Sequence, residues 1–161
     1  MKTAIIFKTR HGTTEKVAHL LAKRLTESGD EVRVIDLAKT RQPHLTTIEK
    51  IIVGGSIHVG KIQREIRTFC DRHIEALTSK KLGLYICCME ADDEKRQKEF
   101  DDAFPAELKK HASAKGIMGG EFLLEKMNFI ERLVVRKVAH TRESVHDIDM
   151  DAVERFLKEI A

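Results

Sequence analysis

The chain has 161 residues, of which 42% are hydrophobic and 34% are charged, and its formal net charge is +3. This length suits one domain, and the hydrophobic fraction is large enough for a buried core, which excludes a disordered chain. The weak positive charge does not indicate nucleic acid, and a chain without Trp and with one Tyr lacks the aromatic side chains that stack on single-stranded bases. We therefore expect a single domain over residues 1–161 that does not bind nucleic acid.

Cysteine usage and hydropathy predict a cytoplasmic protein. Cys70, Cys87 and Cys88 have neither metal-ligand spacing nor the even number of a disulfide set, so we expect reduced structural thiols and no metal site. The apolar run at residues 4–7 is too short for a signal peptide, and no stretch approaches the roughly 20 apolar residues of a membrane span. Peripheral contact with the inner face of the membrane stays open.

Apolar runs and helical periodicity alternate along the first half of the chain. Continuous apolar runs are typical of strands buried on both faces of a parallel sheet, and a 3.6-residue period indicates helices. In order, we expect a strand at Thr3–Lys8, a helix at Thr14–Ser28 ended by Gly29, and strands at Glu31–Asp36 and Glu49–Ser56. Residues 37–48 are too weakly patterned to predict a helix.

The same alternation continues to the carboxyl terminus. We expect a helix at Gln63–Leu77, a strand at Lys81–Met89, a helix at Asp93–His111 broken or bent at Pro105, a strand at Gly116–Phe122 and a closing helix at Met150–Ile160. An insert of about residues 123–146 separates the last strand from the closing helix. The alternation predicts an α/β fold with a doubly wound sheet of five parallel strands and helices on both faces.

The loop after the first strand has the features of a phosphate site. It runs into the amino terminus of a helix, where free N–H groups and the helix dipole favour an anion. Gly12 allows close backbone approach, and the hydroxyls of Thr9 and Thr14 are donors. The candidate phosphate ligands are Thr9, Arg10, His11, Gly12, Thr13 and Thr14. The alternative is a plain helix-capping turn with Thr13 as the N-cap.

The residues around this loop resemble the flavodoxin signature. Ile5, Ile6, Phe7, Thr9, Gly12, Thr14, Ala18 and Leu21 match it at every defined position. The resemblance implies a flavodoxin-like fold with strand order 2-1-3-4-5, in which the loop after the first strand holds the phosphate of non-covalently bound FMN at the switch point of the sheet.

By the same resemblance, two further loops hold the isoalloxazine ring. Their residues are Ser56, Ile57, His58, Val59, Gly60 and Lys61 after the third strand, and Cys88, Met89, Glu90 and Ala91 after the fourth. Electron-transfer flavodoxins commonly place Trp and Tyr against the ring and are strongly acidic, and this chain has neither feature. His58 lies either near the ring or in solvent. No side chain is assigned a catalytic role, because the flavin performs the redox chemistry.

A second resemblance is to the menaquinone-dependent protoporphyrinogen oxidases. The loop over residues 54–60 (GGSIHVG) is similar to theirs, and that family also carries a helical insert after the fifth strand. The resemblance implies an FMN-dependent oxidoreductase with a quinone acceptor. The alternative is a non-enzymatic electron-transfer flavodoxin that serves a redox partner protein.

The insert itself is amphipathic over residues 123–139. Leu133, Val134 and Val138 cluster at helical spacing, and basic residues (Arg132, Arg136 and Lys137) lie elsewhere on the helix. A basic amphipathic helix is typical of contact with an anionic membrane surface, where a lipid-soluble quinone is found. The alternative is a helix that packs half-buried on the domain.

Overall fold

The structure is a computed structural model that describes residues 1–122 and 145–161. Its main sheet contains five parallel strands in the order β2-β1-β3-β5-β6. These strands are β1 (Lys2–Phe7), β2 (Glu31–Asp36), β3 (Lys50–His58), β5 (Lys81–Cys87) and β6 (Ala114–Ile117). When the parallel strands alone are counted, this is the order 2-1-3-4-5, so the predicted fold class is confirmed.

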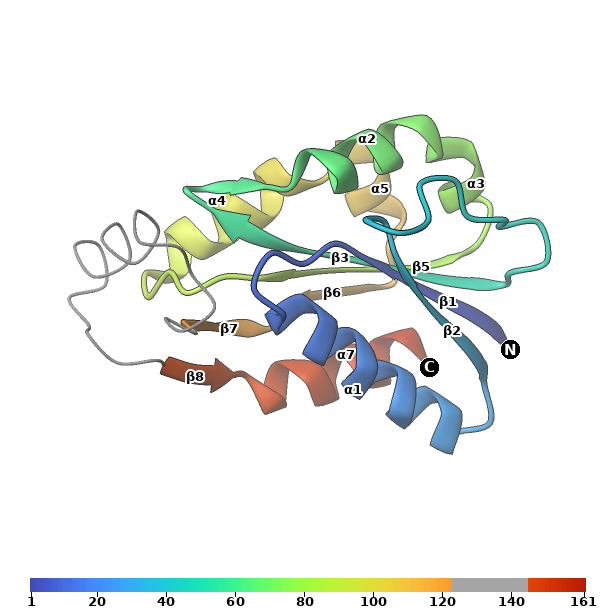
Figure 1. Ribbon diagram of the computed structural model, residues 1–161, viewed down its shortest axis with the longest axis horizontal. Helices are drawn as coiled ribbons and strands as arrows, with labels where there is room; N and C mark the ends of the chain where they lie inside the picture. The colour runs from blue at the N-terminus through green and yellow to red at the C-terminus, as the bar shows by residue number, and fades with distance from the viewer. Residues whose placement is uncertain (123–144) are drawn as a thin grey trace.

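Helices cover both faces of the sheet, as Figure 1 shows. On one face lie α1 (Thr13–Glu27) and α7 (Met150–Ile160). The other face carries α2 (Arg64–Arg72), α3 (Ile74–Thr78), α4 (Asp93–Ala103) and α5 (Ala106–His111). Helices on both faces bury both sides of the central strands, which is why those strands read as unbroken apolar runs.

Side chains of each strand alternate between two hydrophobic clusters. Ala4 and Ile6 of β1 pack with the face covered by α2–α5, whereas Ile5 and Phe7 pack with the face covered by α1 and α7. Neighbouring Cys87 and Cys88 divide between the two clusters in the same way. All three cysteines fall among the described residues, where they are buried and none forms a disulfide, as predicted.

Two predicted helices are interrupted. The helix predicted at Gln63–Leu77 is divided at His73, whose Nδ1 donates a hydrogen bond to the Phe69 carbonyl at 2.9 Å and whose ring stacks on the Phe69 ring. This side-chain bond takes a carbonyl of the last turn of α2 and ends the helix there. The break predicted at Pro105 is confirmed, with Phe104 extended before the proline.

The predicted fifth strand is wrong in its bounds. Gly116–Phe122 was expected as one strand, but β6 begins at Ala114 and ends at Ile117. Past Met118, β7 (Gly119–Phe122) leaves the main sheet and pairs antiparallel with β8 (Val145–Ile148), which the sequence did not predict. Gly119 has a φ of 69°, a conformation that glycine adopts without strain, and the chain turns there.

The remaining predicted elements agree with the structure to within two residues at each end, and residues 37–48 contain no helix. Of the predicted insert, residues 145 and 146 belong to β8, and the helical part at 123–139 lies outside the described residues. The two strands β7 and β8 therefore flank the insert at its points of departure from the domain.

Candidate functional site

Three loops meet at one edge of the sheet. They follow β1, β3 and β5, which are adjacent and parallel. The register pairs Phe7 with Gly54 and Ser56 with Cys87, so the three strands end at nearly the same level. Ligands of doubly wound sheets bind in the crevice beyond such carboxyl ends. The candidate residues of all three loops are thus gathered on the edge where the sequence placed them.

The first loop turns sharply into α1. Gly12 is the N-cap with a φ of 98°, and its N–H donates to the Thr9 hydroxyl oxygen at 2.9 Å. The alternative with Thr13 as a capping residue is wrong, because Thr13 is already the first helical residue and no side chain caps the helix. The N–H groups of the first turn therefore keep their capacity to bind an anion.

Thr14 carries the clearest sign of an expected ligand. Its side chain is fully buried, and its hydroxyl oxygen has no hydrogen-bond partner among the described residues. A buried hydroxyl in this condition costs about 1–3 kcal/mol unless a ligand or water binds it. A phosphate group at the amino terminus of α1 would accept this hydroxyl, so the residues present fit a phosphate-bearing cofactor.

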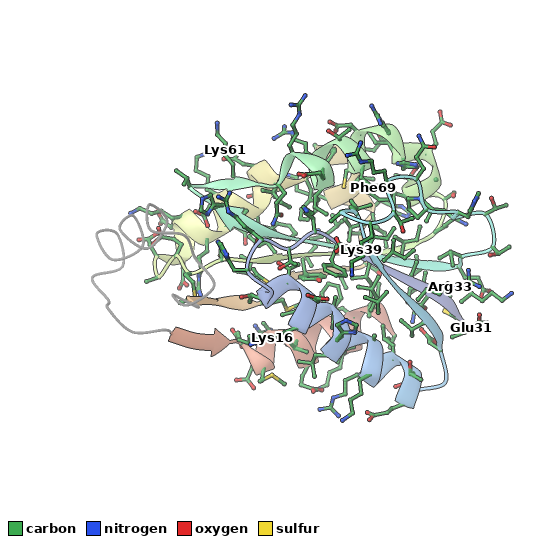
Figure 2. All side chains as sticks on the ribbon, in the orientation of Figure 1. Lys16, Glu31, Arg33, Lys39, Lys61 and Phe69 are labelled. Carbon is green, nitrogen blue, oxygen red and sulfur yellow. The ribbon has the colours of Figure 1, made fainter. Side chains whose placement is uncertain are left out.

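The second loop is a β-hairpin, which the sequence did not predict. The end of β3 pairs antiparallel with β4 (Lys61–Ile62) across a turn at Val59 and Gly60. Both turn residues have positive φ, 50° and 73°, as in the type I′ turn common in two-residue hairpins. Val59 is 79% exposed at the tip, and Lys61 extends from the outer strand (Figure 2). Valine in place of the usual Asn or Asp conceals this turn in the sequence.

Gln63 holds the base of this hairpin and was missed by the sequence reasoning. Its Oε1 accepts a hydrogen bond from the Ser56 N–H at 2.9 Å, and its Nε2 donates to the Ser56 hydroxyl at 2.5 Å. These two bonds join the Gln63 side chain to both the backbone and the side chain of Ser56, seven residues earlier. No motif in the sequence marks Gln63, because its role depends on the hairpin bringing it back to Ser56.

The third loop follows β5 and is anchored at both ends. The Cys88 N–H donates to the Gly119 carbonyl at 2.8 Å, and Asp92 caps α4 by accepting from the Lys95 N–H. Burial raises the pKa of the Cys88 thiol to about 12, and the charge of Glu99 adds to the shift. This thiol is therefore inert at neutral pH, as expected of a structural cysteine.

Glu99 of α4 interacts with Cys88 at the start of the third loop, and no motif in the sequence marks it. Burial raises its pKa, a hydrogen bond with the Cys88 thiol lowers it, and the charge of Glu90 raises it. One of its carboxylate oxygens is buried without a hydrogen-bond partner among the described residues. In sequence Glu99 is one of many acids on α4, which is why its burial could not be seen there.

The structure assigns different exposures to the predicted residues. Buried residues are Thr13, Thr14 and Cys88; half-buried residues are Thr9, His11, Gly12, Ser56, Ile57, His58, Met89 and Glu90; and exposed residues are Arg10, Val59, Gly60, Lys61 and Ala91. Among the described residues, no three His, Cys, Asp or Glu side chains are arranged to hold a metal ion. A search of the same residues for a helix that could span a membrane found none.

Known proteins resemble this chain over most of its length. Residues 4–149 match the flavodoxin domain family, and a flavodoxin domain implies binding of a flavin. Over 172 aligned residues the chain is 22% identical to protoporphyrinogen IX dehydrogenase [quinone] of Escherichia coli (strain K12), covering 100% of this chain and 95% of that protein.

Two flavodoxins are also similar to this chain, one in sequence and one in structure. The chain is 31% identical to the flavodoxin of Clostridium saccharobutylicum over 84 residues, which is 52% of each protein. A solved flavodoxin structure from Streptococcus pneumonia TIGR4 superimposes with a TM-score of 0.58 at 18% identity, covering 99% of this chain and 97% of that one. The superposition shows that the fold is shared.

Proposed function

This chain belongs to the flavodoxin domain family, and we propose that it is an FMN-dependent oxidoreductase that passes electrons from a reduced substrate to a quinone. The substrate class that we propose, a porphyrinogen, comes from the name of the full-length Escherichia coli relative. The observation that carries the cofactor assignment is the buried Thr14 hydroxyl at the start of α1, which lacks a partner among the described residues.

Each loop has a distinct role in holding the cofactor. The turn at Gly12 exposes the N–H groups of the first turn of α1 to the phosphate, and the Thr14 hydroxyl donates to it. The hairpin after β3 and the loop after β5 would hold the isoalloxazine ring with aliphatic and thioether side chains, from Ile57, Val59 and Met89. When bound, the flavin supplies the transfer of hydride or electrons, and the chain binds, orients and shields it.

Two features favour an enzyme over a simple electron carrier. The similarity to the E. coli dehydrogenase extends over the whole chain, whereas the similarity to the Clostridium flavodoxin covers about half. In addition, neither ring loop contains Phe, Tyr or Trp. A ring held by aliphatic side chains has an open face for a small substrate, whereas a stacked Trp or Tyr would cover it.

The alternative is an electron-transfer flavodoxin that serves a redox partner protein. The 31% identity to the Clostridium flavodoxin favours this alternative, because it falls in a shorter but more similar region. Both alternatives require the same FMN site, so binding of the cofactor does not distinguish them. Only the identity of the electron donor and acceptor does.

The cofactor assignment is tested by comparing FMN with riboflavin, which lacks the phosphate. Thr14→Val keeps the shape of the side chain and should weaken FMN binding about tenfold, since a hydrogen bond to a charged group contributes about 1.5–3 kcal/mol. Riboflavin affinity should not change. Gly12→Val should abolish FMN binding, because a branched side chain cannot adopt a φ of 98° without strain. Equal affinity of the parent protein for FMN and riboflavin would contradict the phosphate site.

The oxidoreductase assignment is tested by anaerobic reduction of the FMN-loaded protein, followed by addition of a menaquinone analogue. Reoxidation by the quinone, and reduction of the flavin by protoporphyrinogen, are the expected results. A protein that exchanges electrons with neither compound, but does so with a reductase and a ferredoxin-type acceptor, is an electron carrier.

We further propose that the insert brings the protein to the membrane that contains the quinone. The proposal rests on the sequence of residues 123–139, which lie outside the described residues. Charge reversal of Arg132, Arg136 and Lys137 should reduce binding to anionic liposomes, since each basic residue contributes about 1 kcal/mol near such a surface. FMN content should be unchanged. Quinone reoxidation that ignores these charges would remove the membrane role and leave the oxidoreductase assignment intact.

A further inference from the structure

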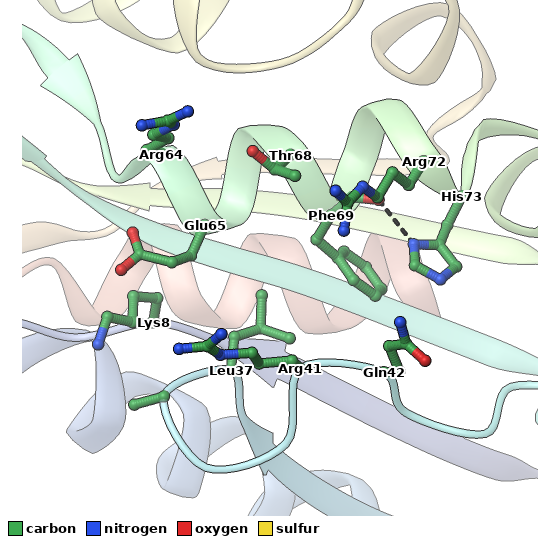
Figure 3. Close-up of a pocket in the computed structure, with 11 residues that line it drawn as sticks. Lys8, Leu37, Arg41, Gln42, Arg64, Glu65, Thr68, Phe69, Arg72 and His73 are labelled. Carbon is green, nitrogen blue, oxygen red and sulfur yellow. Dashed lines mark hydrogen bonds between the residues drawn. The ribbon is translucent and has the colours of Figure 1, made fainter.

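A groove separate from the three cofactor loops lies between α2 and the segment that follows β2 (Figure 3). Its volume is about 710 Å³, within the range of small-molecule sites. Phe69 and Leu37, both 4% exposed, belong to the core beneath it. The residues that line it are Lys8, Leu37, Ala38, Arg41, Gln42, Arg64, Glu65, Thr68, Phe69, Arg72 and His73.

The groove has a strong excess of positive charge. Four of its side chains are Lys or Arg and one is an acid, Glu65. Removing these five residues from the chain's 29 basic and 26 acidic residues leaves equal numbers of each. The groove alone therefore has a formal charge of +3, equal to the net charge of the whole chain. A cleft lined by charge of one sign concentrates the electrostatic field and attracts ligands of the opposite sign.

These cations are not neutralised by the surrounding protein. Lys8, Arg41, Arg64 and Arg72 form no ion pair or side-chain hydrogen bond within residues 1–122 and 145–161, although Glu65 lies on the same groove. By contrast, Arg24 and Lys98 on other surfaces pair with Glu154 and Asp102 at 2.8 and 2.5 Å. Other surface cations of the described residues also lack a carboxylate, but these four line one groove, and their clustering points to an external anion.

The fold places these cations on opposing walls. Arg64, Thr68 and Arg72 fall four residues apart on α2 and so share one side of the helix, whereas Arg41 and Gln42 come from the segment across the groove. Lys8 closes one end, directly after β1. The Nδ1 bond from His73 to the Phe69 carbonyl and the stacking of their rings hold the inner wall in place.

We propose that this groove is a binding site for a small organic anion with at least two separated carboxylate or phosphate groups. Guanidinium groups bind both kinds of oxyanion through paired hydrogen bonds. Arg41 and Arg72 stand on different walls, so a ligand with an acidic group at each end can contact both at once. Gln42 and Thr68 add neutral donors. None of the residues that line the groove belongs to the three candidate cofactor loops, so its ligand can be tested separately from the redox function.

The test uses the FMN-saturated protein, so that the phosphate loop is filled. Calorimetric titration with citrate and with inorganic pyrophosphate separates a carboxylate ligand from a phosphate ligand. At least one probe should bind saturably with one site per chain. Arg41→Ala with Arg72→Ala should weaken that binding at least tenfold. The matched control, Lys23→Ala with Arg33→Ala, removes the same charge from exposed positions elsewhere and should leave the affinity within twofold.

Two further measurements keep the outcome decisive. In the parent protein, the probe should shift the backbone amide signals of Gln42, Thr68 and Arg72, whatever the fate of the variants. Arg41→Lys with Arg72→Lys keeps the charge but loses the planar guanidinium, and should show intermediate affinity. Absence of saturable binding for both probes, amide shifts elsewhere, or equal weakening by the control pair would overturn the proposal.

Discussion

The hydroxyl of Tyr85 donates a buried hydrogen bond to the main-chain carbonyl of Thr14 at 3.2 Å. Tyr85 lies in β5, an interior strand between β3 and β6, and Thr14 lies in the first turn of α1. The bond therefore joins the interior of the sheet to the turn that carries the candidate phosphate site. Burial raises the pKa of the Tyr85 hydroxyl well above its ordinary value, so it remains a donor throughout the neutral range.

Tyr85→Phe should loosen this connection without disturbing the packing of the ring. The Thr14 carbonyl can still accept its helical bond, so we expect a loss of about 1 kcal/mol in the free energy of unfolding, the usual contribution of one hydrogen bond. FMN should bind more weakly, because α1 is less firmly placed. Urea denaturation of the apoprotein and titration with FMN measure the two effects. An unchanged FMN affinity would show that the bond serves stability alone.

Gly54→Ala tests the close approach of the Tyr85 ring to β3. A Cβ at residue 54 would overlap the ring, which is fully buried and packed edge-on against Phe156. The ring cannot move aside, so we expect a loss of more than the roughly 1–3 kcal/mol typical of overpacking.

The control for this substitution is Gly29→Ala, where nothing lies within 4 Å of an added Cβ. Its φ of 97° makes alanine strained, at a cost of about 1–2 kcal/mol. Thermal unfolding should rank the parent above Gly29→Ala and Gly29→Ala above Gly54→Ala. The reverse order of the two variants would mean that β3 and β5 can separate to admit the methyl group.

Gln63→Leu should affect the ring side of the cofactor site and spare the phosphate side. Without the Gln63 amide, the Ser56 N–H and hydroxyl lose their partners and the hairpin becomes mobile. We expect FMN and riboflavin to weaken by the same factor, in contrast to Thr14→Val, which should affect FMN alone. Parallel titrations of the two flavins distinguish these patterns, and a loss confined to FMN would place the hairpin away from the ring.

Asp30 makes stability depend on acidic pH. Burial by itself would raise its pKa, but hydrogen bonds from Thr3, Lys50 and the amino-terminal ammonium group hold the value at about 2, below the ordinary 3.8. A depressed folded-state pKa means that this carboxylate stabilises the protein fully above about pH 4, and that the contribution is lost as pH falls towards 2.

Asp30→Asn should therefore be less stable than the parent protein at pH 7, because Lys50, only 2% exposed, is left without its carboxylate. The difference should shrink as the pH falls from 4 to 2, since the parent loses the same charge by protonation. Denaturant unfolding at several pH values measures this. A difference that stays constant down to pH 2 would locate the effect in packing instead.

The resemblance to the flavodoxins implied the strand order, whereas the parallel sheet and the first loop were predicted from the residues themselves. These rest on local signals: apolar runs at β1, β3 and β5, the helical period of α1, and Gly12 between a strand and a helix. Each signal involves residues close together in the chain, and the connection rules of α/β folds leave few ways to arrange them. That is why the fold class and the placement of the three loops at one edge agree with the structure.

The side chains that support the site are identified only by contacts between distant parts of the chain. Gln63 reaches Ser56 through an unpredicted hairpin, Tyr85 reaches Thr14 across 71 positions in the chain, and Glu99 is a half-buried acid on a helix whose other acids are exposed. Likewise, β7 leaves the sheet because its partner β8 comes from beyond the insert. Such contacts depend on packing between distant segments, for which no local pattern exists. The charged groove beside α2 could not be predicted for the same reason, because its walls come from separate parts of the chain.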